Sequence, residues 1–68
     1  MITFKERLKE LRLEKELSQK QLGEIVNMSK MAISHWEHGN SEPSILQLII
    51  LADYFQVSVD YLIGKTDD

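Results

Sequence analysis

The sequence contains no cysteine, and its 68 residues include only one proline and one tryptophan. Without cysteine the chain cannot form a disulfide, a thiolate metal site or a thiol nucleophile, which excludes the usual stabilising links of small secreted domains. Long apolar runs are also missing: the longest, at 48–52, is far shorter than the roughly 18 residues that span a bilayer. The first residues lack the apolar core of a signal peptide. We therefore expect a cytoplasmic protein without a membrane anchor.

The length and the charge narrow the function further. A chain of this size predicts a single domain, 1–68, whose small core leaves little room for an enzyme active site. The net charge of −3 argues mildly against nucleic-acid binding, because DNA-binding surfaces are usually basic. The charge is uneven, however: 1–40 carry seven Lys or Arg and six acids, whereas 41–68 carry one Lys and five acids. Any DNA-binding face is therefore expected in 1–40.

Start and stop signals divide the chain into five short helices and no strand, which predicts an all-α five-helix bundle. The first helix follows Thr3, a good N-terminal cap, and Phe4, Leu8 and Leu11 recur at the spacing of one helical face. The charged residues between them, including Arg7, are expected to face solvent.

A second helix begins after Ser18, which forms a capping box with Gln21. The apolar residues expected on its buried face are Leu22, Ile25 and Val26. Gly23 lies inside this helix at a cost of about 1 kcal/mol relative to Ala. We therefore expect Gly23 to admit the close approach of another helix.

The second and third helices are separated only by 27–29. Asn27 tolerates the left-handed conformation that a tight turn requires, Ser29 can cap the helix at 30–38, and Gly39 can end it. Two short amphipathic helices joined by a turn of three or four residues form a helix-turn-helix arrangement.

The fourth helix is expected to open at 42–44 and to run to 55, and Ser58 can cap a last turn at 59–63. The fourth helix is apolar on nearly all sides, which predicts a central position in the bundle. One face suits the core and comprises Leu48, Leu51, Ala52 and Phe55. A second stripe comprises Leu46, Ile50 and Tyr54, with Val57, Val59 and Tyr61 near it in the sequence. Either the first or last helix of the same chain covers this stripe, or a second subunit does.

Several short motifs occur together, in order and over nearly the whole chain. They are Leu17-Ser18-Gln19 with Leu22, Met28-Ser29 with Ile33-Ser34, Glu37 with Gly39, then Pro43 and residues 57–62. In this combination the sequence resembles the Cro/C1 (Xre-like) family of phage and bacterial repressors. Gly23 and Asn27 depart from the family, which favours Ala and Gly at these positions, and both departures concern packing and turn geometry. The resemblance implies a transcriptional regulator that places its third helix in the major groove of DNA.

In such proteins the exposed residues of the third helix contact base edges. Here the resemblance assigns that role to Lys30, Met31, Ser34 and His35, which share one helical face. Without the surrounding motifs, an ordinary solvated surface would explain these four residues better. The resemblance also implies phosphate contacts for Gln19, Lys20 and Asn40.

Arg12 and Glu37 occupy positions that the family joins by an ion pair, and we expect a structural role for this pair. A carboxylate near a helix C-terminus opposes the helix dipole and therefore needs a cationic partner. A metal site at His35 and His38 is disfavoured because a third ligand is missing, and the Ser34–His38 pair lacks an oxyanion hole. We expect no cofactor and no metal.

One reading helix covers too few base pairs to mark a site in a genome, so the resemblance predicts a homodimer on a palindromic operator. The dimer interface is expected at Leu46, Ile50, Tyr54, Val57, Val59 and Tyr61. An alternative function is a protein-interaction module of the same fold, such as an antitoxin or a module that docks another regulator. The negative charge slightly favours this alternative, whereas no group of residues supports an enzyme.

Overall fold

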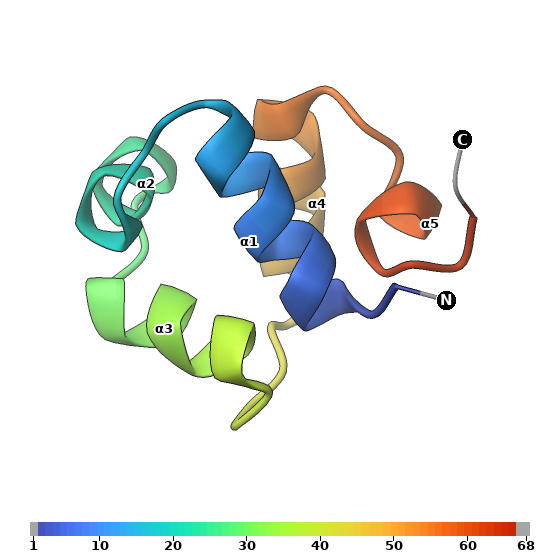
Figure 1. The fold of residues 1–68 in the computed structure, drawn as a ribbon, viewed down its shortest axis with the longest axis horizontal. Coiled ribbons are helices and arrows are strands. Elements are labelled where there is room, and N and C mark those ends of the chain that lie inside the picture. Colours follow the sequence, from blue (N-terminus) through green and yellow to red (C-terminus); the bar gives the residue numbers. More distant parts are fainter. Residues whose placement is uncertain (1, 67–68) are drawn as a thin grey trace.

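The computed structural model describes residues 2–66, and the regular structure in this part of the chain is entirely helical (Figure 1). The helices are α1 (Phe4–Glu14), α2 (Gln19–Val26), α3 (Lys30–His38), α4 (Ile45–Phe55) and α5 (Val59–Leu62). This confirms the all-α prediction with five helices. Helix α1 packs against α3 and α5, and α4 packs against α2 and α5.

Serine side chains begin four of the five helices. The hydroxyl oxygens of Ser18, Ser29, Ser44 and Ser58 each accept a hydrogen bond from a backbone N–H in the first turn. At the ends of α2 and α3, Asn27 and Gly39 adopt the left-handed conformation, with φ of 59° and 77°. The local signals in the sequence therefore placed the helix-turn-helix correctly.

The core consists of ten buried apolar residues contributed by all five helices. They are Leu8, Leu11, Leu22, Val26, Ile33, Trp36, Leu51, Ala52, Phe55 and Leu62. Two expectations about which residues are buried were wrong. Ile25 is half-exposed, because Gly23 and Val26 take the inner side of α2 beside Leu22. Arg7 is buried, because its guanidinium lies 3.8 Å from the centre of the Tyr61 ring.

Gly23 lies against the turn that precedes α3 and against the first residue of α3, where an added Cβ would lie 3.4 Å from the Lys30 backbone nitrogen. A Cβ added at Gly23 would collide with the backbone carbonyl oxygen of Met28, in the turn that joins α2 to α3. The expected close approach of another helix is thus present at the N-terminus of α3, and the tightest contact is with the turn before it. Glycine lets the turn fold back directly on α2, which brings α3 into place immediately after it.

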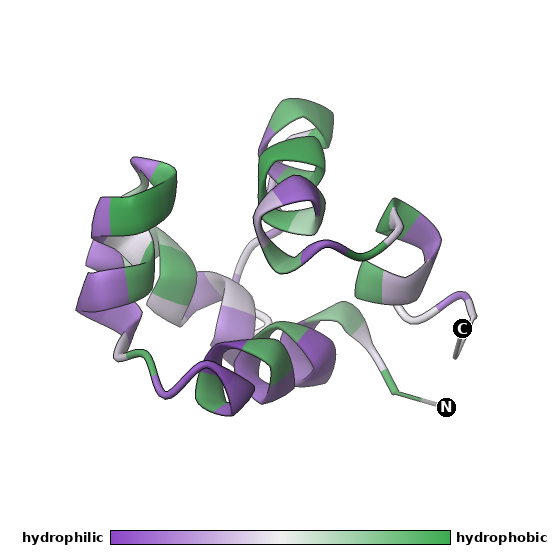
Figure 2. Cartoon of the chain, turned by 90° about the horizontal axis from the view of Figure 1, so that it is seen from above, coloured by the Kyte–Doolittle hydropathy of each residue, from purple (hydrophilic) through white to green (hydrophobic). Residues whose placement is uncertain are grey.

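The expectation that α4 is the central helix was also wrong. One side of α4 packs on the core through Leu51, Ala52 and Phe55, and the opposite side lies at the surface. Figure 2 shows that hydrophobic residues nevertheless surround much of α4, whereas hydrophobic and hydrophilic residues alternate along α1. Within residues 2–66, no helix has the length and apolar character needed to cross a bilayer.

Candidate nucleic-acid interface

The outer face of α3 gathers the four side chains that the sequence analysis assigned to base reading. Ile33 and Trp36 on the opposite face are buried in the core, so the orientation of α3 is fixed. The outward residues line one open depression of about 520 Å³, and they are Lys30, Met31, Ser34 and His35. Ser34 is half-buried and the other three are exposed. The surface therefore combines hydrogen-bonding groups with one thioether.

Met31 is the unusual member of this group, because 67% of it is exposed. A large apolar side chain at the surface costs solvation free energy when nothing covers it. Its position beside Lys30 and His35 makes the depression partly apolar, which suits a surface that carries both methyl groups and polar edges.

The side chain of His38 forms a hydrogen bond within its own helix. Its Nδ1 lies 2.7 Å from the carbonyl oxygen of Ser34, and because a carbonyl only accepts, Nδ1 carries the proton and donates. The Ser34 hydroxyl lies 3.5 Å from the same nitrogen. A protonated nitrogen cannot remove the proton of that hydroxyl, so this geometry opposes a serine nucleophile. No group of three potential metal ligands occurs among the described residues.

The structure contains the ion pair between Arg12 of α1 and Glu37 of α3. Arg12 Nε donates to Glu37 Oε2 at 2.7 Å and Arg12 Nη2 donates to Oε1 at 2.9 Å, a bidentate geometry. Arg12 Nη1 also donates to the Leu17 carbonyl at 2.7 Å. Only 9% of the Arg12 side chain and 3% of the Glu37 side chain are exposed. The pair therefore links α1, α3 and the segment before α2.

Gln19 forms a contact that the sequence analysis missed. Its Nε2 donates to Glu37 Oε1 at 3.2 Å, so the first residue of α2 is tied to the ion pair. No sequence signal predicts this bond, because it joins residues 18 positions apart through the packing of α2 on α3. Gln19 is half-buried, whereas the neighbouring Lys20 and the more distant Asn40 are exposed.

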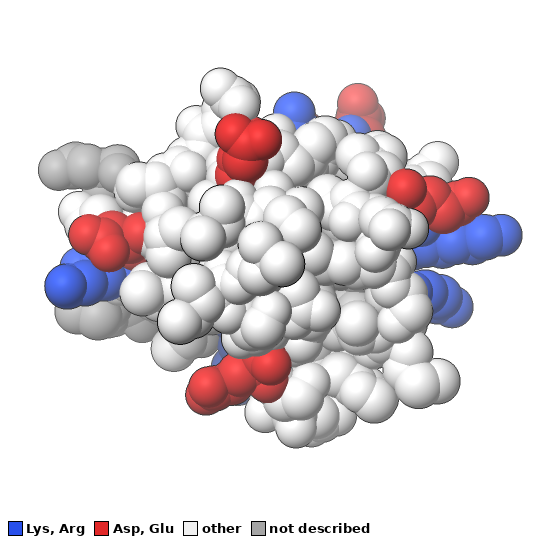
Figure 3. Space-filling view, turned by 180° about the vertical axis from the view of Figure 1, so that it is seen from behind, with Lys and Arg blue, Asp and Glu red and all other residues white. Residues whose placement is uncertain are grey.

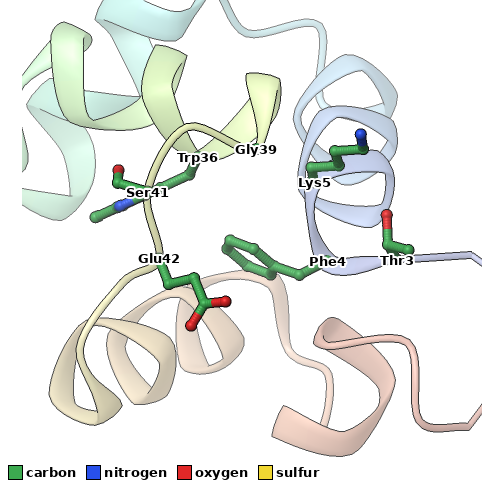
Figure 4. A pocket seen from close by; sticks show the side chains of 7 residues that line it. All are labelled: Thr3, Phe4, Lys5, Trp36, Gly39, Ser41 and Glu42. Carbon is green, nitrogen blue, oxygen red and sulfur yellow. The ribbon is translucent and has the colours of Figure 1, made fainter.

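A second hollow lies near the other end of α3. It encloses about 350 Å³ between the start of α1 and the chain after α3 (Figure 4). Lys5 crosses from α1 toward Gly39, where an added Cβ would lie 3.2 Å from the Lys5 Cδ. The missing side chain at Gly39 thus leaves room for Lys5 beside the C-terminus of α3, where a cation is favourable.

The outward side of α4 is apolar. Its large exposed apolar residues are Ile45, Leu46, Ile49 and Ile50, with exposed fractions of 38% to 78%, and Asp53 is an exposed charged residue of the same helix. Figure 3 shows a broad, mostly uncharged surface on this side of the molecule, with both acidic and basic side chains at its margins. The sequence analysis expected Leu46 and Ile50 in an interface but omitted Ile45 and Ile49, which extend the same surface.

The remaining residues assigned to the dimer interface are partly covered by their own chain. Tyr54, Val57, Val59 and Tyr61 are half-buried and pack against the core. Tyr54 contacts Phe55 edge to face, with ring centres 5.1 Å apart, and the Lys15 ammonium lies 5.1 Å from its ring centre. Leu46 and Ile50 are therefore the members of the assigned set that stay most available to a second molecule.

Comparison with known proteins agrees with this geometry. The family model described as helix-turn-helix matches residues 8–62. The transcriptional regulator YobD of Bacillus subtilis is 38% identical over 63 residues, which cover 93% of this chain and 56% of YobD. The transcriptional activator BcrR of Enterococcus faecalis is 40% identical over 61 residues, covering 90% of this chain and 30% of BcrR. The chain thus spans about half or less of the length of these two relatives.

The fold is also similar to that of a repressor bound to DNA. In a crystal structure of the phage P22 c2 repressor protein in complex with a synthetic operator, the matched chain has a TM-score of 0.89 and 33% identity. The match covers 97% of this chain and all of that one. These findings confirm the resemblance drawn from the motifs: the chain belongs to the Cro/C1-type helix-turn-helix family of transcriptional regulators.

Proposed function

We propose that this chain is a repressor that binds a specific double-stranded DNA sequence, with α3 in the major groove. The observation that supports this most is the depression on α3, where three hydrogen-bonding side chains and one exposed methionine converge on the outer face of a helix-turn-helix. The likeness to an operator-bound repressor supports the same orientation of α3. The protein would act in the cytoplasm, where bacterial DNA is held.

Each reading side chain suits a different feature of the major groove. Lys30 can donate to guanine O6 or N7, and Met31 can pack on a thymine methyl group. Ser34 and His35 can form hydrogen bonds with purine edges. Because these groups differ in chemistry and stand in fixed order along α3, they favour one base sequence over others.

Contacts with phosphate would position the protein without reading the sequence. Gln19 and Lys20 occupy the first two positions of α2, where backbone N–H groups have no partner within the helix and attract anions. Asn40 follows α3 directly and is exposed. These residues all lie within 1–40, which carries a net charge of +1.

We further propose that two copies pair and bind a palindromic operator. Leu46 and Ile50 supply the exposed apolar centre of the interface, and Tyr54, Val57, Val59 and Tyr61 supply its less exposed margin. An isologous interface would place the two α3 helices on half-sites about 34–36 Å apart, one turn of DNA.

Selection of bound fragments from random DNA tests this function. We expect an inverted repeat whose half-sites are one helical turn apart, and an affinity that falls steeply as salt rises from 50 to about 200 mM. Recovery of no common sequence would contradict the proposal, and so would a single half-site bound by one chain at saturation.

A protein-interaction module is the second candidate. It is favoured by the exposed apolar residues of α4 and by the net charge of −4 in 41–68, of which Asp67 and Asp68 lie outside the described residues. Salt separates the two functions, because an apolar protein interface responds little to ionic strength, whereas binding to phosphate weakens strongly.

A further inference from the structure

The side chain of Gln19 is held in place before any DNA arrives. It stands at the start of α2, on the segment proposed to contact phosphate, and its Nε2 donates to Glu37 Oε1 at 3.2 Å. A glutamine side chain on a helix surface normally samples several rotamers, and binding has to restrict them. Here the partner is a carboxylate whose side chain is 3% exposed, so the acceptor itself does not move freely.

The charge of Glu37 would ordinarily oppose DNA at this position. Arg12 cancels it with two hydrogen bonds of 2.7 and 2.9 Å, and these bonds raise the pKa of Arg12 above its usual value. Arg12 is therefore charged at every pH at which DNA binding is measured. The carboxylate can accept a bond from Gln19 while contributing little net negative charge toward a phosphate.

The geometry leaves part of the Gln19 amide available. The Nε2 group carries two protons, and Glu37 accepts one of them. The other proton is free to be donated elsewhere, near the backbone N–H groups of the first turn of α2. A fixed amide beside these N–H groups forms a site whose donors are already oriented, so less side-chain freedom is lost when an anion binds.

We propose that Glu37 is a positioning residue for DNA binding: held by Arg12, it fixes the Gln19 amide in the orientation that donates to a backbone phosphate. This inference rests on the proposed DNA-binding function and assigns a functional role to a pair that was expected to be purely structural. It predicts that the position of Glu37 depends on Arg12 and that the orientation of the Gln19 amide depends on Glu37. The contact of Gln19 with one phosphate on each half-site depends on that orientation.

The variant Glu37→Gln tests this dependence, because it keeps the shape but offers only one acceptor oxygen. Two Arg12 donors and Gln19 then compete for it, and the charged donor wins, so Gln19 is released. We expect Glu37→Gln to bind all DNA sequences roughly three- to tenfold more weakly, the range of one lost hydrogen bond. Simple charge removal predicts the opposite sign, since losing a negative charge favours DNA binding.

Glu24→Gln is the matched control. Glu24 is exposed on α2 and its replacement changes the net charge by the same amount. We expect this control to bind DNA as well as the unmodified protein or slightly better. If Glu37→Gln also binds equally well or better, Glu37 does not position Gln19.

Neutral methylphosphonate substitutions along the operator supply a readout that a purely structural role would not change. The unmodified protein and Glu24→Gln should lose affinity at the phosphate that Gln19 contacts, whereas Gln19→Ala and Glu37→Gln should be insensitive there. The double variant Gln19→Ala/Glu37→Gln should bind no more weakly than Gln19→Ala. Retained sensitivity in Glu37→Gln, or full additivity, would overturn the inference.

Circular dichroism first establishes whether Glu37→Gln is folded. If it is unfolded, a measurement on the unmodified protein tests the inference instead. Nitrogen relaxation of the Gln19 side-chain amide should then give an order parameter near the rigid value of about 0.85, and one below about 0.6 would overturn the inference. The two proposals fail in different ways. Absence of salt-dependent DNA binding removes the proposed function, whereas binding without dependence on Glu37 removes this inference alone.

Discussion

Helices α1–α3 and helices α4–α5 surround the same core, but they are held to it by different kinds of contact. In the first group, a buried ion pair between Arg12 and Glu37 adds to the apolar packing of Ile33 and Trp36. In the second group, apolar residues such as Leu51 and Phe55 provide the attachment. The outward surfaces differ in the same sense, since α3 exposes mixed polar groups and α4 exposes aliphatic ones.

The two groups of helices therefore differ in how strictly their contacts fix the orientation of each helix. Apolar packing is non-directional and allows small rotations, whereas a bidentate ion pair fixes both distance and angle. A buried ion pair seldom adds more stability than well-packed apolar residues of similar size would. We therefore infer that the pair serves the proposed DNA binding, because it holds α3 on α1 in one orientation.

Breaking the Arg12–Glu37 ion pair should give the largest loss in the free energy of unfolding. Arg12→Ala or Glu37→Ala leaves a buried charge without its partner, which costs about 3–5 kcal/mol. For a domain whose total stability is about 5 kcal/mol or little more, either variant should be only marginally stable, with a measurable unfolded fraction at 37 °C. Urea denaturation measures the loss at lower temperature. The double variant should lose less than the sum of the two single variants, because it leaves no unpaired charge.

Glu10→Ala is the control for this prediction. Glu10 is 44% exposed and lies 3.7 Å from the buried Arg7, and Arg7 keeps its contact with the Tyr61 ring when Glu10 is removed. The loss should therefore be about 1 kcal/mol, well below that of Glu37→Ala. Equal losses for Glu10→Ala and Glu37→Ala, or a coupling of zero between Arg12 and Glu37, would show that the buried ion pair does not hold α3 on α1.

Placing a charge on the α4 surface should weaken dimer formation and leave the fold of α1–α3 unchanged. Ile50→Glu puts a carboxylate at the proposed dimer interface, and we expect a loss of about 2 kcal/mol or more, roughly thirtyfold in pairing on the operator. Sedimentation with palindromic DNA measures it. Ile25→Glu is the matched control, because Ile25 is a half-exposed isoleucine on α2. A dimer that survives Ile50→Glu but not Ile25→Glu would move the interface to α2.

Truncating the reading face should change specificity more than overall affinity. Met31→Ala and His35→Ala should each cost about 1–3 kcal/mol on the selected operator and little on random DNA. Leu13→Ala, which shortens another exposed apolar residue on α1, should change neither value. Binding titrations at fixed salt make the comparison. Equal losses on both DNAs would show that α3 contributes affinity without direct base reading.

The local features of the fold were predictable from the sequence, and the long-range ones were not. Serine caps and the left-handed Asn27 depend on neighbouring residues, so pattern alone located α2 and α3. The burial of Arg7 depends on Tyr61, more than fifty positions away, and helical periodicity carries no information about that contact. The same limit explains why the four residues of the α3 depression were identified correctly as one face, while the Gln19–Glu37 bond was missed.

The smallest effect concerns the first turns of α1 and α4, which differ in one ionisable group. At α1 the Glu6 carboxylate accepts hydrogen bonds from the Thr3 hydroxyl at 2.7 Å and the Thr3 N–H at 3.2 Å, and these bonds lower the pKa of Glu6 below 4.5. At α4 the equivalent acceptor is the neutral amide of Gln47, bonded to the Ser44 N–H at 2.8 Å. Because the pKa of Glu6 is lowered on folding, its contribution to stability is present above pH 4.5 and is lost as the pH falls through the lowered value. Glu6→Gln should therefore flatten the acid side of the stability curve slightly, whereas Gln47→Glu should introduce a new pH dependence of the same sign at α4. Urea denaturation at several pH values between 2 and 7 measures both slopes, and a Glu6→Gln curve parallel to that of the unmodified protein would show that this capping interaction does not stabilise α1.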